Sequence, residues 1–393
     1  MTRRLGRAAL GGLMSNVLLS ALVAVGAGAV VLAADGVQPS TAFSAMVSGA
    51  FSGPGLLATL TTFVALAGCS LAFSASLRAG LFNLGGEGQL ILGALATAIV
   101  GIYAPLPSWL LLPAGLGAGA VAGSAWAFLP AILEIRLSVP LLISTLLLSY
   151  PALAFVSWMV SFPLHDPSAQ YDQTVPMRPD ARLFELRPDL TAGIVIVLVL
   201  GLVMAVVDAR TASGYEVRMM GVSPRFAAYG GVKRGVTMLR SMGASGALYG
   251  VTGAILVAGF PYLLNVQILI APLYVWTALM AALLARGSPL GAMVASFAFA
   301  ALAIGSQSME RATQIPHELA DILEAVVIIL VATRAAPTLL RVVRQRLFRR
   351  RGVTTSLVEP FPAPSKDAQA ENPTEVGPLV LASLAAPRDE APS

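Results

Sequence analysis

The sequence predicts an all-α integral membrane protein, and its composition and patterning carry that prediction. Of the 393 residues, 56% are hydrophobic and only 11% are charged, and the mean hydropathy is +0.79. About a quarter of the residues in a soluble domain are charged. Apolar stretches long enough to cross roughly 30 Å of hydrocarbon as helices recur along the chain, whereas the alternating segments of a membrane β-barrel do not.

About ten membrane spans are expected, each an apolar stretch bounded by charge, proline or glycine. They lie near residues 13–34, 55–77, 87–104, 109–132, 141–162, 190–208, 241–262, 267–285, 288–306 and 319–337. The first stretch is longer than the roughly 7 to 15 apolar residues of a signal peptide, so we interpret it as an uncleaved span.

The distribution of Lys and Arg predicts that both termini face the cytoplasm. Cytoplasmic loops retain positive charge, and a cytoplasmic N-terminus places 19 of the 25 basic residues in inner segments. The outer loops then hold only Arg178, Arg182, Arg187 and Arg311. This asymmetry accounts for the net charge of +5 in a membrane protein. The positive charge therefore does not indicate nucleic acid as a partner.

The sequence divides into a transmembrane domain, residues 1–340, and a cytoplasmic tail, residues 341–393. The tail is basic at first and then rich in Pro, Ala, Ser and acidic residues from 352 onward. It has no amphipathic period, so we expect it to be disordered. The single cysteine, Cys69, lies in an apolar stretch, and one cysteine cannot form an intrachain disulfide.

A polar stretch, RAGLFNLGGEGQ at residues 78–89, interrupts two apolar ones. Non-helical backbone survives at membrane depth only where it is buried in protein or lines a wet cavity. We expect a broken helix near residues 78–87, with Asn83 as the N-cap of a helix from about Glu87 to Tyr103. Glu87 then lies in the first turn, where the helix dipole offsets part of its charge, and Arg78 is a candidate second partner.

Two interpretations of this break are open. Glycines alone favour close helix packing, as small residues do in many membrane bundles. Asn83, Glu87 and Gln89 together favour a break that lines a translocation pathway, because polar side chains are expensive in lipid and broken helices mark substrate sites in transporters.

A second polar segment, residues 209–240, contains the signals of two short helices. Tyr215 to Met220 is expected to form one helix, closed by Gly221. Ser223 is expected to cap the next, which has Pro224 at its first position and Gly230 with Gly231 at its end. Its basic residues fit ordinary positive-inside anchoring, but the ordered cap signals favour a rigid cytoplasmic element that another subunit can push.

Two further observations concern partners and catalysis. The longest outer loop, residues 163–189, is either a solvated connection or a docking surface for an external partner. No GxxxxGK[ST] sequence occurs to hold ATP phosphates, and His165 and His317 lack companions at metal-ligand spacing. We therefore expect a chain that is not an enzyme and draws its energy from elsewhere.

Three stretches resemble the permease subunits of bacterial ABC importers for nucleosides and simple sugars, within the ribose and branched-chain amino acid permease superfamily. GLFNLGGEGQLILGALATAIV is similar to that family's signature. GYEVRMMGVSPRFAAYGGV resembles its cytoplasmic loop, and SMGASGALYGVTGAILVAG resembles the glycine-rich span that follows. The likeness covers roughly residues 55–335, while the Gly85-Gly86 pair and the long tail depart from the usual pattern.

The resemblance implies a multi-pass permease of the bacterial cytoplasmic membrane, surrounded by lipid. It implies three protein partners: an ATPase subunit that binds ATP and Mg²⁺, a second permease that is identical or related, and an extracytoplasmic solute-binding protein. This chain itself then needs no cofactor and no metal.

The resemblance also assigns residues to two sites. Those at or beside the translocation path are Phe82, Asn83, Glu87 and Gln89. Those in the region that couples to the ATPase are Arg218, Gly221, Pro224, Arg225 and Ala227.

Uncharged polar groups and an aromatic ring at the break suit a neutral hydroxylated or purine solute better than an ion. The expected mechanism is alternating access driven by the partner ATPase. The alternatives are an ion-coupled secondary transporter or channel for a small polar solute, and a membrane scaffold without transport of its own.

Overall fold

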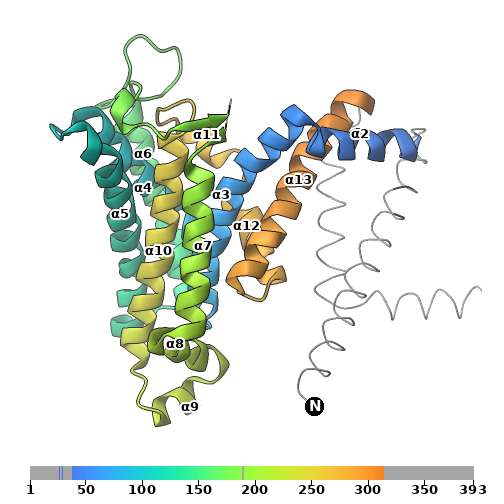
Figure 1. Cartoon of the computed structure of the whole chain (residues 1–393). Coiled ribbons are helices and arrows are strands. Elements are labelled where there is room, and N and C mark those ends of the chain that lie inside the picture. Colours follow the sequence, from blue (N-terminus) through green and yellow to red (C-terminus); the bar gives the residue numbers. More distant parts are fainter. Residues whose placement is uncertain (1–25, 27–28, 30–37, 188–189, 314–393) are drawn as a thin grey trace, which may run out of the picture. The chain divides into compact units, whose positions relative to one another are not determined.

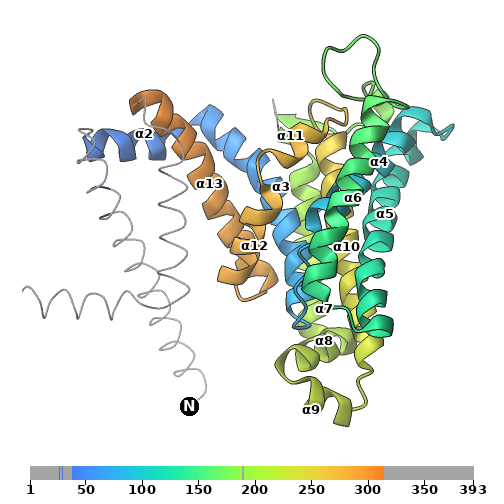
Figure 2. The same cartoon turned by 180° about the vertical axis from the view of Figure 1, so that it is seen from behind.

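A computed structural model describes residues 26, 29, 38–187 and 190–313. Figures 1 and 2 show the helical architecture of this part from two sides. The longer helices are α3 (Gly53–Leu77), α4 (Gly86–Tyr103), α5 (Ser108–Leu137), α6 (Leu141–Ser161), α7 (Gly193–Arg210), α10 (Arg234–Ala258) and α13 (Pro289–Thr313). The shorter ones are α2 (Pro39–Phe51), α8 (Ala212–Val222), α9 (Pro224–Tyr229), α11 (Val266–Ile270) and α12 (Tyr274–Leu284).

The described residues contain eight segments long and apolar enough to cross a membrane, and α11 with α12 forms one of them. They coincide with the second to ninth expected spans, which confirms an all-α membrane fold. The first and tenth expected spans lie outside the described residues, apart from Gly26 and Ala29, as does the tail. The structure also contains a helix that we did not expect, α2, whose 13 residues are too few to register as a span.

Helix α10 lies at the centre of the bundle, and glycines bring it close to α4 and α5. A methyl group added at Gly250 would lie 2.0 Å from the carbonyl oxygen of Gly119 in α5. A methyl group added at Gly93 in α4 would lie 2.3 Å from the Cα of Gly250. Small residues at such crossings let backbones approach closely enough for dispersion contacts to hold the helices together in lipid.

The described residues form two separate hydrophobic cores. The larger follows α3, α4 and α10 through the bundle, and Tyr249, Phe73 and Phe299 are its largest fully buried side chains. The smaller, which we call the basic-end cluster, lies beside α8 and α9. Its buried members are Ala79, Leu81, Ala131, Leu141, Met220, Ala227, Met238 and Met242. We call this end of the bundle the basic end, because Arg218, Arg225, Lys233 and Arg234 lie there.

At the opposite end, the segment between α6 and α7 is pinned to the helices beneath it. It contains the short helix η1 (Pro179–Ala181) and strand β1 (Glu185–Arg187), which pairs antiparallel with β2 (Leu190–Thr191). The guanidinium of Arg178 donates to the carbonyl oxygens of Ala104 and Leu106, at 3.2 and 3.3 Å. Backbone hydrogen bonds from this segment to Gly101 and Ala258 hold it further. The segment of residues 163–187 is therefore held against the ends of these helices by hydrogen bonds.

Candidate functional site: a buried break joined to a short helix pair

The expected break between two apolar helices is confirmed. Helix α3 ends at Leu77, a turn follows in which Gly80 has φ +76°, and residues 81–85 are not helical before α4 begins at Gly86. A positive φ favours glycine, so Gly80 allows the chain to reverse there. We call residues 78–85 the break segment.

The break segment enters the bundle along α10. Leu81 belongs to the same cluster as Met238 and Met242, Asn83 bonds Ser245, and Gly86 lies against Tyr249. These partners follow one another along α10 over about 16 Å at 1.5 Å per residue. The non-helical backbone is thus buried in protein, which is the condition for its survival at membrane depth.

Asn83 and Gln89 form a reciprocal amide pair inside the bundle. Asn83 Nδ2 donates to Gln89 Oε1 at 2.9 Å, and Gln89 Nε2 donates to Asn83 Oδ1 at 3.0 Å. Asn83 also donates to Ser245 Oγ and accepts from the N–H of Gly85. Both side chains are buried. Asn83 uses both N–H groups and both lone pairs of its amide in this conformation, whereas Gln89 uses one N–H and one lone pair.

The prediction that Asn83 caps α4 is wrong. The residue preceding α4 is Gly85, and no side chain caps it. Asn83 instead accepts from the N–H two residues on, an Asx turn that stabilises the extended backbone rather than the helix end.

Glu87 lies in the first turn of α4, as expected, but Arg78 is not its partner. The Glu87 Oε1 atom accepts from the indole Nε1 of Trp276 in α12 at 2.7 Å. Arg78 turns the other way and pairs with Asp208 at the end of α7. Phe82 is the fourth residue that the sequence resemblance assigns to the translocation path. Its side chain is 42% exposed and packs edge-to-face on Phe73.

Two short helices follow α7, as the cap signals predict. Thr211 caps α8 by accepting from the N–H of Gly214, and Ser223 caps α9 by accepting from the N–H of Phe226, with Pro224 as the first residue. Helix α8 is longer than expected, because it begins at Ala212 and continues through Gly221 to Val222. Gly221 therefore does not close a helix, and its role is a close contact described next.

Gly221 joins α8 directly to the break segment. A methyl group added at Gly221 would lie 2.2 Å from the carbonyl oxygen of Arg78 and 3.2 Å from the backbone N of Gly80. Asp208 reinforces this contact, because it pairs with both Arg78 and Arg218, the latter at 3.3 Å. Arg218 also donates to the backbone carbonyl of Asp208. Carboxylate–guanidinium pairs in such partly buried positions are directional and strong.

The residues expected to couple to an ATPase divide between the inside and the surface of the α8–α9 pair. Ala227 is buried in the basic-end cluster, and Arg218 is tied to Asp208. Pro224 and Arg225 are exposed. Beside them lie three exposed apolar side chains that we did not single out from the sequence: Val222, Phe226 and Tyr229, at 85%, 61% and 92% exposure.

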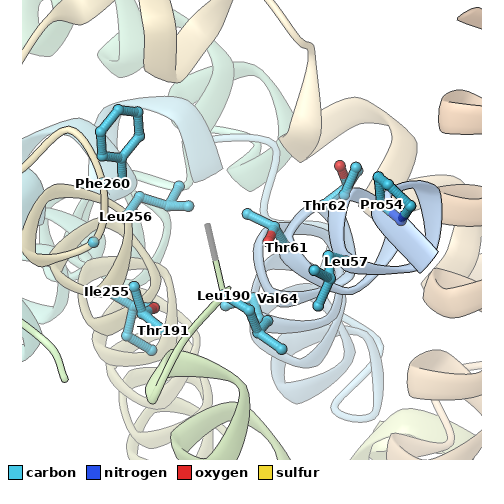
Figure 3. Close-up of a pocket in the computed structure, with 12 residues that line it drawn as sticks. Pro54, Leu57, Thr61, Thr62, Val64, Leu190, Thr191, Ile255, Leu256 and Phe260 are labelled. Carbon is cyan, nitrogen blue, oxygen red and sulfur yellow. The ribbon is translucent and has the colours of Figure 1, made fainter. Parts of the chain in front are cut away.

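A cavity of about 600 Å³ lies at the opposite end of the bundle. Figure 3 shows the side chains of α3, including Leu57 and Thr61, facing Leu256 of α10 and Thr191 of β2 across it. Its lining is apolar apart from the threonine hydroxyls. None of the four residues expected at the translocation path lines this cavity.

The described residues define a polytopic membrane protein. They contain eight apolar segments, a buried non-helical segment among these, and an ordered pair of short helices beside them. A family model described as the permease component of the branched-chain amino acid transport system matches residues 55–332, and the chain belongs to that family.

Three relatives show similarity over most of their length. The glucose ABC transporter permease of Haloferax volcanii is 33% identical over 329 residues, covering 80% of this chain and 86% of the relative. The guanosine ABC transporter permease of Bacillus subtilis is 29% identical over 331 residues, covering 81% and 93%. The nucleoside ABC transporter permease of Lactococcus lactis is 27% identical over 320 residues, covering 78% and 87%.

This chain is therefore the permease subunit of an ABC importer and a multi-pass protein of the inner membrane. It is a transport subunit and not an enzyme. The family implies that an ATPase and other subunits complete the transporter.

Proposed function

We propose that this permease moves a nucleoside or a simple sugar into the cell by alternating access, powered by ATP hydrolysis in a separate subunit. The contact of Gly221 with Arg78 and Gly80 is the observation that carries the proposal. It connects the surface helices that a motor can push to the backbone that interrupts the bundle.

The α8–α9 pair is the ATPase contact in this proposal. Exposed aromatic and apolar side chains next to a basic residue are typical of interface centres, and Val222, Phe226 and Tyr229 lie beside Arg225. Gly221, which is itself exposed, and Arg218 connect this surface to the break segment, and we infer that they transmit its movement. The basic end then faces the cytoplasm, in agreement with the distribution of Lys and Arg.

The break segment is the moving part of the path in this proposal. The amide pair of Asn83 and Gln89 holds it against α10 in the present conformation. We infer that displacement of α8 separates this pair and turns Asn83, Gln89 and Phe82 toward a passing solute. Transport cycles require such a two-state element.

Two further partners belong to the proposal. The ordered outer segment, residues 163–187, offers a fixed surface on which an extracytoplasmic solute-binding protein can dock. Its Asp166 stays charged, because hydrogen bonds from the side chain and backbone N–H of Ser168 lower the pKa of that carboxyl. The second permease, an identical or related chain, completes the pathway.

The substrate class rests on the relatives and on the chemistry of the break. The names of the relatives give glucose, guanosine and nucleosides as their transported solutes. Amide, carboxylate and aromatic side chains are the groups that recognise hydroxylated rings and bases.

Reconstitution into lipid vesicles tests the proposal. Uptake of radiolabelled guanosine or glucose is measured with the permeases, the ATPase and the solute-binding protein, with and without ATP. We expect uptake only when ATP and the ATPase are both present. Uptake driven by a sodium or proton gradient without nucleotide would show a secondary transporter instead, and no uptake with any partner would show a scaffold.

A further inference from the structure

We propose that Trp276 and Tyr249 form, with Glu87, the site that binds the hydroxyl groups of the transported solute. The inference rests on the proposed function and adds two residues that nothing in the sequence singled out. The ligand chemistry is a ring that carries neighbouring hydroxyl groups, which is common to ribose and hexoses.

Three helices bring these side chains to the first turn of α4. Gly86 provides the space between them: a methyl group added there would lie 2.6 Å from Cζ of Tyr249 in α10 and 2.7 Å from Cγ1 of Val275 in α12. The hydroxyl-bearing end of Tyr249 therefore abuts the backbone next to Glu87. Trp276, the neighbour of Val275, donates its N–H to the carboxylate of Glu87.

This cluster has unused hydrogen-bonding capacity, whereas the amide of Asn83 has none left. Among the described residues, the fully buried hydroxyl of Tyr249 has no hydrogen-bond partner. Glu87 accepts from Trp276 and forms no ion pair with any described cation. A carboxylate has about four acceptor sites, so most of its capacity remains. Asn83 and Gln89, by contrast, are bonded to one another.

An orphaned buried hydroxyl is destabilising, and an ionised carboxylate at membrane depth is more so. Such groups persist at functional sites, where a ligand supplies the missing partners. In the proposed site, hydroxyl groups of the solute donate to Glu87 and accept from Tyr249. The indole of Trp276 adds a flat apolar face for a sugar ring or a base, and its N–H holds the carboxylate in position.

Equilibrium binding of radiolabelled solute to the purified permease–ATPase complex, without the solute-binding protein, tests the inference. Adenosine and glucose serve as separate probes, so that the nucleoside and sugar sources of the hydroxyl groups are distinguished. Their deoxy analogues show whether hydroxyl groups are read. The variants are Glu87→Gln, Trp276→Phe and Tyr249→Phe, and Trp109→Phe is the control, because Trp109 is 76% exposed at the opposite end of the bundle.

We expect Kd for the hydroxylated probe to rise about tenfold in each variant, as the loss of one hydrogen bond in a buried site predicts, and to stay constant in the control. Discrimination against the deoxy analogue should fall by a similar factor. Tyr249→Phe should not lower the melting temperature, because it removes a hydroxyl without a partner, and this separates a binding role from a structural one.

Unchanged Kd values in all three variants, or wild-type binding that does not distinguish the deoxy analogues, would overturn the inference. The inference would also be overturned if the wild-type complex transported solute with ATP but bound neither probe. A failure of the proposed function would appear differently, as the absence of ATP-dependent uptake by the wild-type transporter in vesicles.

Discussion

Gly221 and Arg78 touch through their backbones, although they are 143 positions apart in the sequence: the space that a side chain at Gly221 would need is occupied by the carbonyl oxygen of Arg78. Gly221 belongs to α8 outside the membrane spans, and Arg78 begins the break segment. The contact makes the two elements neighbours without an intervening side chain, so a shift of one displaces the other.

Replacing Gly221 with alanine tests that contact. The added methyl overlaps the backbone of Arg78, and such overpacking typically costs about 1 to 3 kcal/mol. We expect ATP-dependent uptake to fall at least tenfold, while the ATPase still co-purifies because the exposed face of α9 is unchanged. Gly117→Ala in α5 is the matched control, since nothing lies within 4 Å of the position of an added Cβ there. Normal uptake by Gly221→Ala would contradict the role of this contact.

Replacing Asp208 with asparagine removes the shared partner of Arg78 and Arg218. Both guanidinium groups are only partly exposed, so the loss should reduce stability by about 2 kcal/mol, more than a surface pair and less than a fully buried one. Thermal unfolding in detergent measures the effect. Glu216→Gln, which breaks the 3.6 Å pair with the exposed Arg240, should change the melting temperature little. Equal effects of the two substitutions would argue against a special role for Asp208.

The amide pair in the break segment makes a separate prediction. Asn83→Ala leaves Gln89, Ser245 and the N–H of Gly85 without their partner in a buried site. We expect a loss of about 2 to 4 kcal/mol, seen as a lower melting temperature. Ser161→Ala removes only an exposed hydrogen bond to Asp172 and serves as the control. A melting temperature like that of the control would show that the pair does not hold the break segment.

Substitutions on the exposed surface of the α8–α9 pair test whether the ATPase binds there. Arg225→Glu and Phe226→Ser change exposed side chains and should leave the melting temperature unchanged. We expect both to reduce co-purification of the ATPase at least tenfold, as truncation at an interface centre does. Arg218→Glu should instead lower stability, because it places a carboxylate beside Asp208. Full co-purification with Arg225→Glu and Phe226→Ser would mean that the ATPase docks elsewhere.

Local sequence signals predicted much of this fold. Apolar stretch length placed the eight described spans, and Ser223 with Pro224 marked the start of α9 correctly. The polar residues between two apolar stretches marked the break. All of these depend on residues close together in the chain, where capping and membrane thickness leave few choices.

The parts that sequence could not predict depend on contacts between distant segments. Arg78 pairs with Asp208 across 130 positions, and Glu87 with Trp276 across 189. A tryptophan within an apolar stretch carries no signal that distinguishes it from a packing residue, so Trp276 went unnoticed. The position of Asn83 before α4 suggested a helix cap, but its amide instead hydrogen-bonds Gln89 in α4 and Ser245 in α10.

Hydrogen–deuterium exchange in the vesicle-embedded transporter tests the central claim, that the α8–α9 pair and the break segment move together. Exchange in peptides covering 79–86 and 212–229 is compared between the nucleotide-free state and the state trapped with ATP and vanadate. We predict that exchange changes in both segments of the unmodified protein. In Gly221→Ala, the change in 79–86 should disappear, whereas the change in 212–229 should remain. A change confined to 212–229 in the unmodified protein would contradict it.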